Sequence, residues 1–196
     1  MKIIAATSNK GKVREIRSIF SSSDIEIISM SELGINIDIE ETGTTFEENA
    51  AIKADSIAKL CSFPVLADDS GLCVEALGGA PGIYSARYAG GSATDDEKID
   101  KLLENMKDKT NRKAKFVSAV VLVFPNGEKI TAKGEVFGHI TNKRSGHGGF
   151  GYDPVFYADE LGKTFGESDE EEKNKVSHRG RALTALYEIM KERGLI

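Results

Sequence analysis

Two adjacent carboxylates after an apolar segment are the first residues of this chain that could do chemistry. Residues 63–67 read Phe-Pro-Val-Leu-Ala, a pattern typical of an interior strand, and Asp68 and Asp69 follow where that strand is expected to end. Ligands of α/β proteins bind at this end of the strands. Neighbouring strand residues point to opposite faces, so one carboxylate can face a ligand while the other positions a loop. The pair predicts a metal site, although Asp-Ser-Gly is also typical of a simple turn.

More acidic and basic groups lie upstream. Glu40 and Glu41 precede a predicted helix and offer the hard oxygen ligands that Mg²⁺ prefers, unless they form only an exposed acidic turn. Glu48 and Lys53 lie five residues apart on that helix, close to the i,i+4 spacing of surface pairs but not at it. Both could equally be solvated surface residues.

The segment 7–12, Thr-Ser-Asn-Lys-Gly-Lys, lies between a predicted strand and a predicted helix. Free amide groups and the helix dipole favour an anion at such a helix start, which predicts a phosphate site. The segment lacks the Walker pattern of P-loop proteins. An ordinary Ser or Asn cap followed by solvated lysines explains it as well.

Two later segments could bind a flat base. Residues 147–154 combine glycines, which permit close backbone approach, with two aromatic rings that can stack and with Asp153, which can accept from a ring N–H. A sharp turn with two core aromatics is the alternative. Donors for phosphate or purine oxygens then gather around an expected helix start, unless they form a charged helix face. They are Lys173, Lys175, Ser177, His178 and Arg179.

The elements that must position these residues alternate between helix and strand. This order predicts an α/β protein with a mixed central sheet flanked by helices, and it allows two lobes with a cleft between them. A capping box at residues 94–97 marks one helix start clearly. We expect strands over 2–7, 25–29 and 65–67, a hairpin of 115–124 with 129–136, and helices over 10–20, 45–61, 94–106 and after Ser177.

Length and composition narrow the class of protein. The 196 residues, 40% of them hydrophobic, are enough for one domain spanning 1–196. The net charge of −5 argues against general nucleic-acid binding, so any phosphate site must be local. No apolar run reaches the roughly 18 residues of a membrane span and no signal peptide is evident, so we expect a cytoplasmic protein without membrane contact. Cys61 and Cys73 show no zinc or CxxC spacing and are expected to be reduced thiols.

Taken together and in order, these segments resemble the inosine triphosphate pyrophosphatase family, most closely its bacterial members. These house-cleaning enzymes hydrolyse non-standard purine nucleoside triphosphates. Several separate blocks in the same order are far more specific than any one of them. The matching blocks are residues 7–12, 40–43, 45–50, 67–72, 78–87, 148–154, 164–167 and 177–180.

The resemblance implies an elongated α/β subunit in a homodimer, with the nucleotide in a cleft between two lobes. It also implies Mg²⁺-dependent cleavage between the α and β phosphates of dITP, ITP or XTP, which gives a monophosphate and pyrophosphate. Glu40 or Glu41 would bind the metal with Asp69, and Asp69 would also accept a proton from the attacking water. The implied substrate-binding residues are Thr7, Ser8, Asn9, Lys10, Gly11, Lys12, Lys53, Ser70, Phe150, Gly151, Tyr152, Asp153, Lys173, His178 and Arg179.

The chemistry of the base agrees with this resemblance. A donor such as the Arg179 guanidinium favours the 6-oxo group of hypoxanthine or xanthine over the amino group of adenine. Rejection of guanine must depend on its 2-position. Lys175 could share the contact of Lys173. Two alternatives remain open: a phosphohydrolase of another specificity, and a nucleotide sensor without catalysis.

Overall fold

The computed structural model describes all residues from Met1 to Ile196. Seven strands form one sheet in the order β2-β1-β3-β4-β5-β6-β7. They are β1 (Lys2–Ala5), β2 (Glu26–Ser29), β3 (Val65–Val74), β4 (Lys113–Val123), β5 (Lys129–Ile140), β6 (Phe156–Ala158) and β7 (Lys163–Thr164). β1 pairs parallel with β2 and β3, whereas β6 pairs antiparallel with β5 and β7. The predicted mixed sheet is confirmed.

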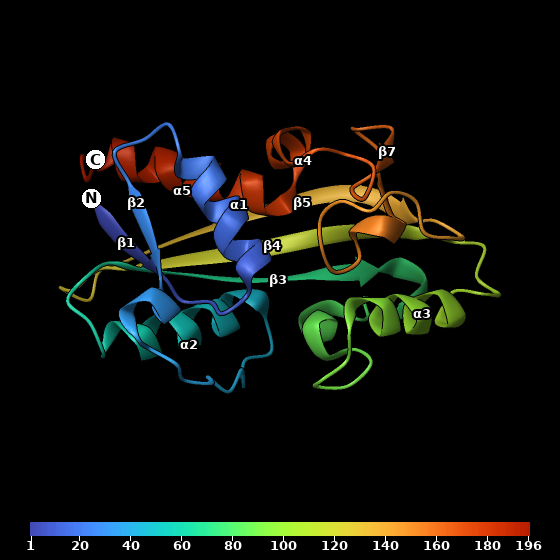
Figure 1. The fold of residues 1–196 in the computed structure, drawn as a ribbon, viewed down its shortest axis with the longest axis horizontal. Coiled ribbons are helices and arrows are strands. Elements are labelled where there is room, and N and C mark those ends of the chain that lie inside the picture. Colours follow the sequence, from blue (N-terminus) through green and yellow to red (C-terminus); the bar gives the residue numbers. More distant parts are fainter. The chain divides into compact units, whose positions relative to one another are not determined.

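Five α-helices accompany the sheet (Figure 1). They are α1 (Lys10–Phe20), α2 (Phe46–Ala58), α3 (Asp95–Asn105), α4 (Glu170–Val176) and α5 (His178–Glu192). Short 3-10 helices cover Met30–Leu33, Glu75–Leu77, Gly82–Arg87 and Asp153–Val155. No helix is both long enough and apolar enough to cross a membrane.

The chain contacts divide the protein into two compact units, and each unit has hydrophobic clusters of its own. The first unit contains Met1–Asp69, Ser118–Gly134 and Arg179–Ile196, and the second contains Ser70–Val117 and Glu135–His178. The unit boundaries cut β3, β4 and β5, so these three strands contribute residues to both units.

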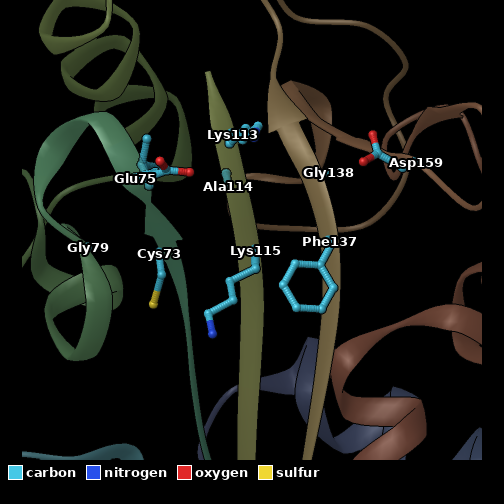
Figure 2. Close-up of a pocket in the computed structure, with 10 residues that line it drawn as sticks. Cys73, Glu75, Gly79, Lys113, Ala114, Lys115, Phe137, Gly138 and Asp159 are labelled. Atoms are coloured by element: carbon cyan, nitrogen blue, oxygen red, sulfur yellow. The ribbon is translucent and has the colours of Figure 1, made fainter. Parts of the chain in front are cut away.

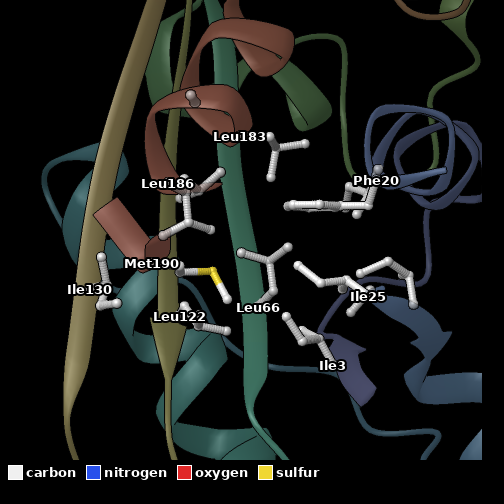
Figure 3. Close-up of a cluster of buried hydrophobic side chains, with 14 residues drawn as sticks. Ile3, Phe20, Ile25, Leu66, Leu122, Ile130, Leu183, Leu186 and Met190 are labelled. Carbon is white, nitrogen blue, oxygen red and sulfur yellow. The ribbon is translucent and has the colours of Figure 1, made fainter. Parts of the chain in front are cut away.

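In the first unit, helices cover both faces of the strands, which explains their continuous apolar runs. Ile3 packs with Phe20 of α1 and Leu183 of α5, and Figure 3 shows these side chains converging on Leu66 of β3. The next residue, Ile4, belongs to a separate cluster with α2. Successive strand residues thus fill two different cores because their side chains alternate between faces.

The second unit has one core between α3 and its strands. Ile99 and Leu102 of α3 pack in the same cluster as Leu72 of β3. Aromatic rings belong to the same cluster: the rings of Phe116 and Phe156 lie 4.7 Å apart in an edge-on arrangement. This packing anchors the segment that follows β5.

Local signals fix the helix starts as expected. Asn9 caps α1, where its side chain accepts a hydrogen bond from the Lys12 amide at 3.1 Å. Thr94 and Glu97 form the predicted capping box of α3. These caps satisfy amide groups that the first helical turn leaves without a backbone partner.

The predicted hairpin is confirmed, with longer strands than expected. Near its turn, the Phe124 amide donates to the Glu128 carbonyl at 2.9 Å, and at its far end the Ile140 amide donates to the Arg112 carbonyl at 2.9 Å. The partners move apart along the chain in opposite directions, so β4 and β5 are antiparallel.

Other boundaries differ from the predictions. The strand expected to end at Ala67 continues to Val74, so Asp68 and Asp69 lie inside β3 and not at its end. The helix expected over 45–61 ends at Ala58, and α4, β6 and β7 were not predicted at all. Lys173 and Lys175 therefore lie within α4, before the start of α5. Such short elements depend on tertiary contacts more than on local periodicity.

Candidate functional site

The buried carboxylate of Asp68 organises the first unit. One of its oxygens lies 2.9 Å from the Lys12 ammonium and 3.0 Å from Nη2 of Arg179. The other oxygen accepts a hydrogen bond from the Ser118 hydroxyl at 2.6 Å. Arg179 is also paired with Glu15, and only 1% of its surface is exposed. Helices α1 and α5 and strands β3 and β4 thus meet at one ion cluster.

These charges decide the ionisation of the cluster. Burial by itself would raise the pKa of Asp68, but Arg179 and Lys12 hold that pKa well below its usual range. Burial lowers the pKa of Lys12, against the attraction of Asp68. Asp68 is therefore charged near neutral pH and is unsuited to taking up a proton there.

Asp69 belongs to a different cluster, as alternation along β3 requires. Its Oδ1 lies 3.1 Å from the Lys53 ammonium, and Lys53 also binds Glu41 at 2.7 Å. Glu40 is exposed, whereas Glu41 is half-buried. Of the two glutamates that the sequence left open, the structure brings Glu41 to Asp69.

The surroundings give Asp69 the properties of a proton acceptor. Burial raises its pKa above the ordinary value, although Lys53 and Lys12 oppose the rise. Its Oδ2 atom is buried and has no hydrogen-bond partner. Lys53 stays charged, because Asp69 and Glu41 raise the pKa of Lys53 against the effect of burial.

Glu41 and Asp69 fit a magnesium ion. Both carboxylates reach the same lysine ammonium, and the unpartnered Oδ2 of Asp69 offers a free lone pair. No group of three or more His, Cys, Asp or Glu side chains gathers in the chain. Mg²⁺ needs only one or two carboxylates when phosphates and waters complete its coordination, so this donor set suits it.

Residues 7–12, predicted to bind phosphate, divide between two surroundings. Thr7, Ser8 and Lys10 line a pocket of about 360 Å³ in the first unit, whereas Lys12 turns to Asp68. The pocket also contains Arg14 and Arg17, which sequence analysis did not select. Its lining holds three cations and one carboxylate, Glu32, which pairs with Arg17, and this excess of positive charge is compatible with an anion.

In the second unit, Lys173 closes the turn at 150–153. Its ammonium, on a residue only 4% exposed, lies 2.6 Å from Oδ2 of Asp153 and 4.8 Å from the centre of the Phe150 ring. The same Asp153 oxygen accepts from the Phe150 amide at 2.9 Å. Lys175 instead forms an exposed pair with Glu171. The structure therefore separates Lys173 from the second lysine that could have shared its contact.

The remaining predicted residues of this unit have structural partners. The His178 ring is stacked on Phe116 at 4.6 Å. The buried Tyr152 hydroxyl donates to the Ser85 carbonyl at 2.9 Å, and the Gly151 amide donates to Asp95 at 2.7 Å. Ser70, the first residue of the unit, is half-buried in β3. Tyr152 is thus a core aromatic residue, as the alternative interpretation of this turn predicted, whereas the Phe150 ring packs against the Lys173 ammonium.

Gly149 provides a stability test of this turn. Its φ of +73° is strained for any other residue, and an added Cβ would overlap the Asp153 carboxylate. We expect Gly149→Ala to lower the free energy of unfolding by more than the about 1–2 kcal/mol that left-handed strain alone costs. Gly151→Ala is the matched control, because Gly151 has φ +62° with open space around its Cβ position. Urea unfolding of both variants measures the difference, and equal losses would contradict the steric interpretation.

A separate pocket of about 490 Å³ lies in the second unit. Figure 2 shows Cys73, Lys115 and Phe137 projecting from the neighbouring strands β3, β4 and β5 into it. None of the residues predicted to bind metal or nucleotide lines this pocket. It is therefore distinct from the charged clusters around Asp68, Asp69 and Lys173.

Sequence analysis missed Glu15 and Ser118. Both are buried partners of the Asp68 cluster, the first through Arg179 and the second directly. Glu15 falls among the apolar positions of α1, and Ser118 interrupts an apolar strand. Neither pattern indicates which residue the polar side chain contacts. Their contacts lie 164 and 50 residues away along the chain.

Known proteins resemble this chain over nearly its whole length. A dITP/XTP pyrophosphatase of Clostridium perfringens is 48% identical over an alignment of 198 positions, which covers 97% of each chain. One from Staphylococcus epidermidis is 47% identical over 188 residues, covering 96% of this chain and 95% of the relative. The structure of the Staphylococcus aureus Ham1 protein superimposes with a TM-score of 0.87 at 43% identity, covering 98% of this chain and all of that one. The Ham1 family model matches residues 3–189, and the chain therefore belongs to the Ham1 family.

Proposed function

We propose that this protein is a dITP/XTP pyrophosphatase, which hydrolyses non-canonical purine nucleoside triphosphates to the monophosphate and pyrophosphate. The observation that carries this proposal is the pairing of Asp69 with Glu41 through Lys53, which leaves a buried Asp69 oxygen without a partner. The relatives named dITP/XTP pyrophosphatase supply the substrate class. Removing such nucleotides would keep them out of DNA and RNA.

Asp69 acts as the proton acceptor in this proposal. Water attacks the triphosphate, the bond between the α and β phosphates breaks, and the proton of the water passes to the Asp69 carboxylate. Burial favours proton uptake because it raises the pKa of Asp69. Lys12 and Lys53 offset the charge of the phosphates. Mg²⁺, held by Glu41 and Asp69, would polarise the phosphate oxygens and lower the pKa of a bound water.

The rest of the nucleotide is assigned by resemblance together with the contacts of the second unit. The loop at 7–12 would bind the triphosphate, and the turn at 150–153 with Lys173 and His178 would bind the base. Arg179 remains a proposed reader of the 6-oxo group. Arg179 also pairs with Asp68 and Glu15, so it would hold the buried ion cluster around Asp68 in place. Ser70 remains a proposed substrate contact.

We also propose a homodimer in the cytoplasm, with each nucleotide in a cleft between two lobes. The dimer and the cleft follow from the resemblance to the inosine triphosphate pyrophosphatases, whereas the cytoplasmic location is an expectation from the sequence. Sedimentation of the purified protein would test the dimer directly, and a monomer at micromolar concentration would contradict it.

Product-resolved hydrolysis tests the activity. With Mg²⁺, we expect pyrophosphate from dITP and XTP and little product from dGTP or dATP. A buried donor left without an acceptor costs about 1–3 kcal/mol. If adenine leaves two such donors unpaired, the enzyme should prefer dITP over dATP by at least about 30-fold. Orthophosphate as the product would identify another phosphohydrolase. Binding without turnover would identify a nucleotide sensor.

A further inference from the structure

The loop that carries Glu41 has little structure of its own. Residues 35–43 form neither helix nor strand. Immediately after them, the first turn of α2 binds the loop backbone by two side chains. The Asn49 Oδ1 accepts from the Gly43 amide at 2.8 Å, and the Glu48 carboxylate accepts from the Thr44 amide at 2.6 Å. The Asn49 contact is the one closest in sequence to Glu41.

Asn49 is unusual because only half of its amide is satisfied. The residue is 0% exposed, and its Nδ2 is buried without a hydrogen-bond partner. An unpaired buried donor is unfavourable, and an apolar residue of similar volume would avoid it. Asparagine is therefore favourable at this position because of its Oδ1 atom, which accepts the hydrogen bond from the Gly43 amide.

Gly43 is matched to this contact. A Cβ at Gly43 would lie 2.7 Å from Asn49 Oδ1 and 2.7 Å from Cβ of Glu48. Neither neighbour can move easily, because one is a buried amide and the other begins a side chain on the same helical turn. Only glycine lets the loop backbone approach α2 this closely.

The spacing along α2 connects this contact to the charged site. Asn49 and Lys53 are four residues apart and therefore lie on one face of the helix. Asn49 holds the loop at Gly43, and Lys53 binds the Glu41 carboxylate two residues earlier. The helix itself is packed through Ala54 in the same cluster as residues of β3, the strand that carries Asp69. The loop, helix and strand are thus joined by fixed contacts.

We infer that Asn49 is a positioning residue, which sets the Glu41 carboxylate at the distance from Asp69 that a divalent cation requires. The inference rests on the proposed function of Glu41 and Asp69 as metal ligands. Lys53 pairs with both carboxylates, but its flexible side chain does not fix the loop backbone. The hydrogen bond from Gly43 to Asn49 does.

Binding of Mn²⁺ to the protein without nucleotide, followed by electron paramagnetic resonance, tests this role independently of turnover. Asn49→Leu keeps the branching and the number of side-chain heavy atoms and removes the acceptor, and Gly43→Ala disrupts the same contact from the loop side. We expect each to weaken Mn²⁺ binding about 10-fold or more, as for other partners that orient metal ligands. Ile57→Val is the matched control, because Ile57 is an equally buried residue of α2 outside the contact. It should bind Mn²⁺ as the wild type does.

A kinetic readout separates positioning from unfolding. For Asn49→Leu we expect the Mg²⁺ concentration at half-maximal dITP hydrolysis to rise about 10-fold. The rate at saturating Mg²⁺ should return to within about threefold of the wild type. Unchanged Mn²⁺ affinity in both Asn49→Leu and Gly43→Ala would overturn the inference, as would a lost rate that Mg²⁺ does not restore. Glu41→Gln identifies the source of failure: if it leaves Mn²⁺ affinity unchanged, the proposed metal site itself is wrong.

Discussion

Asp69→Asn is expected to lower kcat for dITP by about 10³-fold or more while the protein stays folded. The amide cannot accept the proton of the attacking water, and general-base catalysis alone contributes about 10²–10⁴-fold. The substitution also replaces one of the two proposed carboxylate ligands of magnesium by a neutral amide, so the loss should lie in the upper part of that range. Steady-state hydrolysis at saturating Mg²⁺, with pyrophosphate as the measured product, gives kcat and KM separately.

Two controls make this result specific to the site. Thermal unfolding of Asp69→Asn should resemble that of the wild type, because an amide can still accept from Lys53 at the present 3.1 Å separation. Asp55→Asn removes a carboxylate from an exposed pair with Lys129 and should leave kcat unchanged. A normal rate for Asp69→Asn would show that another group accepts the proton.

Asp68→Asn is expected to lower the free energy of unfolding by about 3–5 kcal/mol near neutral pH. The substitution removes the Asp68 carboxylate from the buried Arg179 and from Lys12. Uncompensated buried charges of this kind cost about that much. Urea unfolding followed by circular dichroism measures the loss. Ser118→Ala, which removes only a hydroxyl donor from the charged Asp68, should cost about 1.5–3 kcal/mol and serves as the comparison.

The stability difference between the wild type and Asp68→Asn should depend on pH, and the direction of this dependence follows from the pKa of Asp68. The pKa of Asp68 is depressed in the folded protein relative to its ordinary value of 3.8. Its carboxylate therefore stabilises the fold fully above that value and progressively less as the pH falls towards the folded-state pKa. The stability difference between wild type and Asp68→Asn should narrow below about pH 4. A difference that stays constant down to pH 2 would contradict the depressed pKa.

The sequence by itself determined the features that depend on neighbouring residues. Apolar spacing located α1 over Lys10–Phe20, and the Thr94 capping box marked the start of α3. Alternation along a strand correctly predicted that the Asp68 and Asp69 side chains lie in different surroundings. Turn chemistry located the β4–β5 hairpin. Each of these signals acts within a few residues, so it is visible without the fold.

The tertiary structure alone decided which charges meet. In the folded protein Lys53 pairs with Glu41 and not with Glu40. Asp153 pairs with Lys173 and not with Lys175. The tertiary structure also buries Arg179 against Asp68, 111 residues away along the chain. Strand β3 continues through its two aspartates because distant cations compensate them. Burial of a charge is tolerated only beside a partner of opposite sign, and that partner is supplied by the packing of remote segments, which local sequence patterns do not encode.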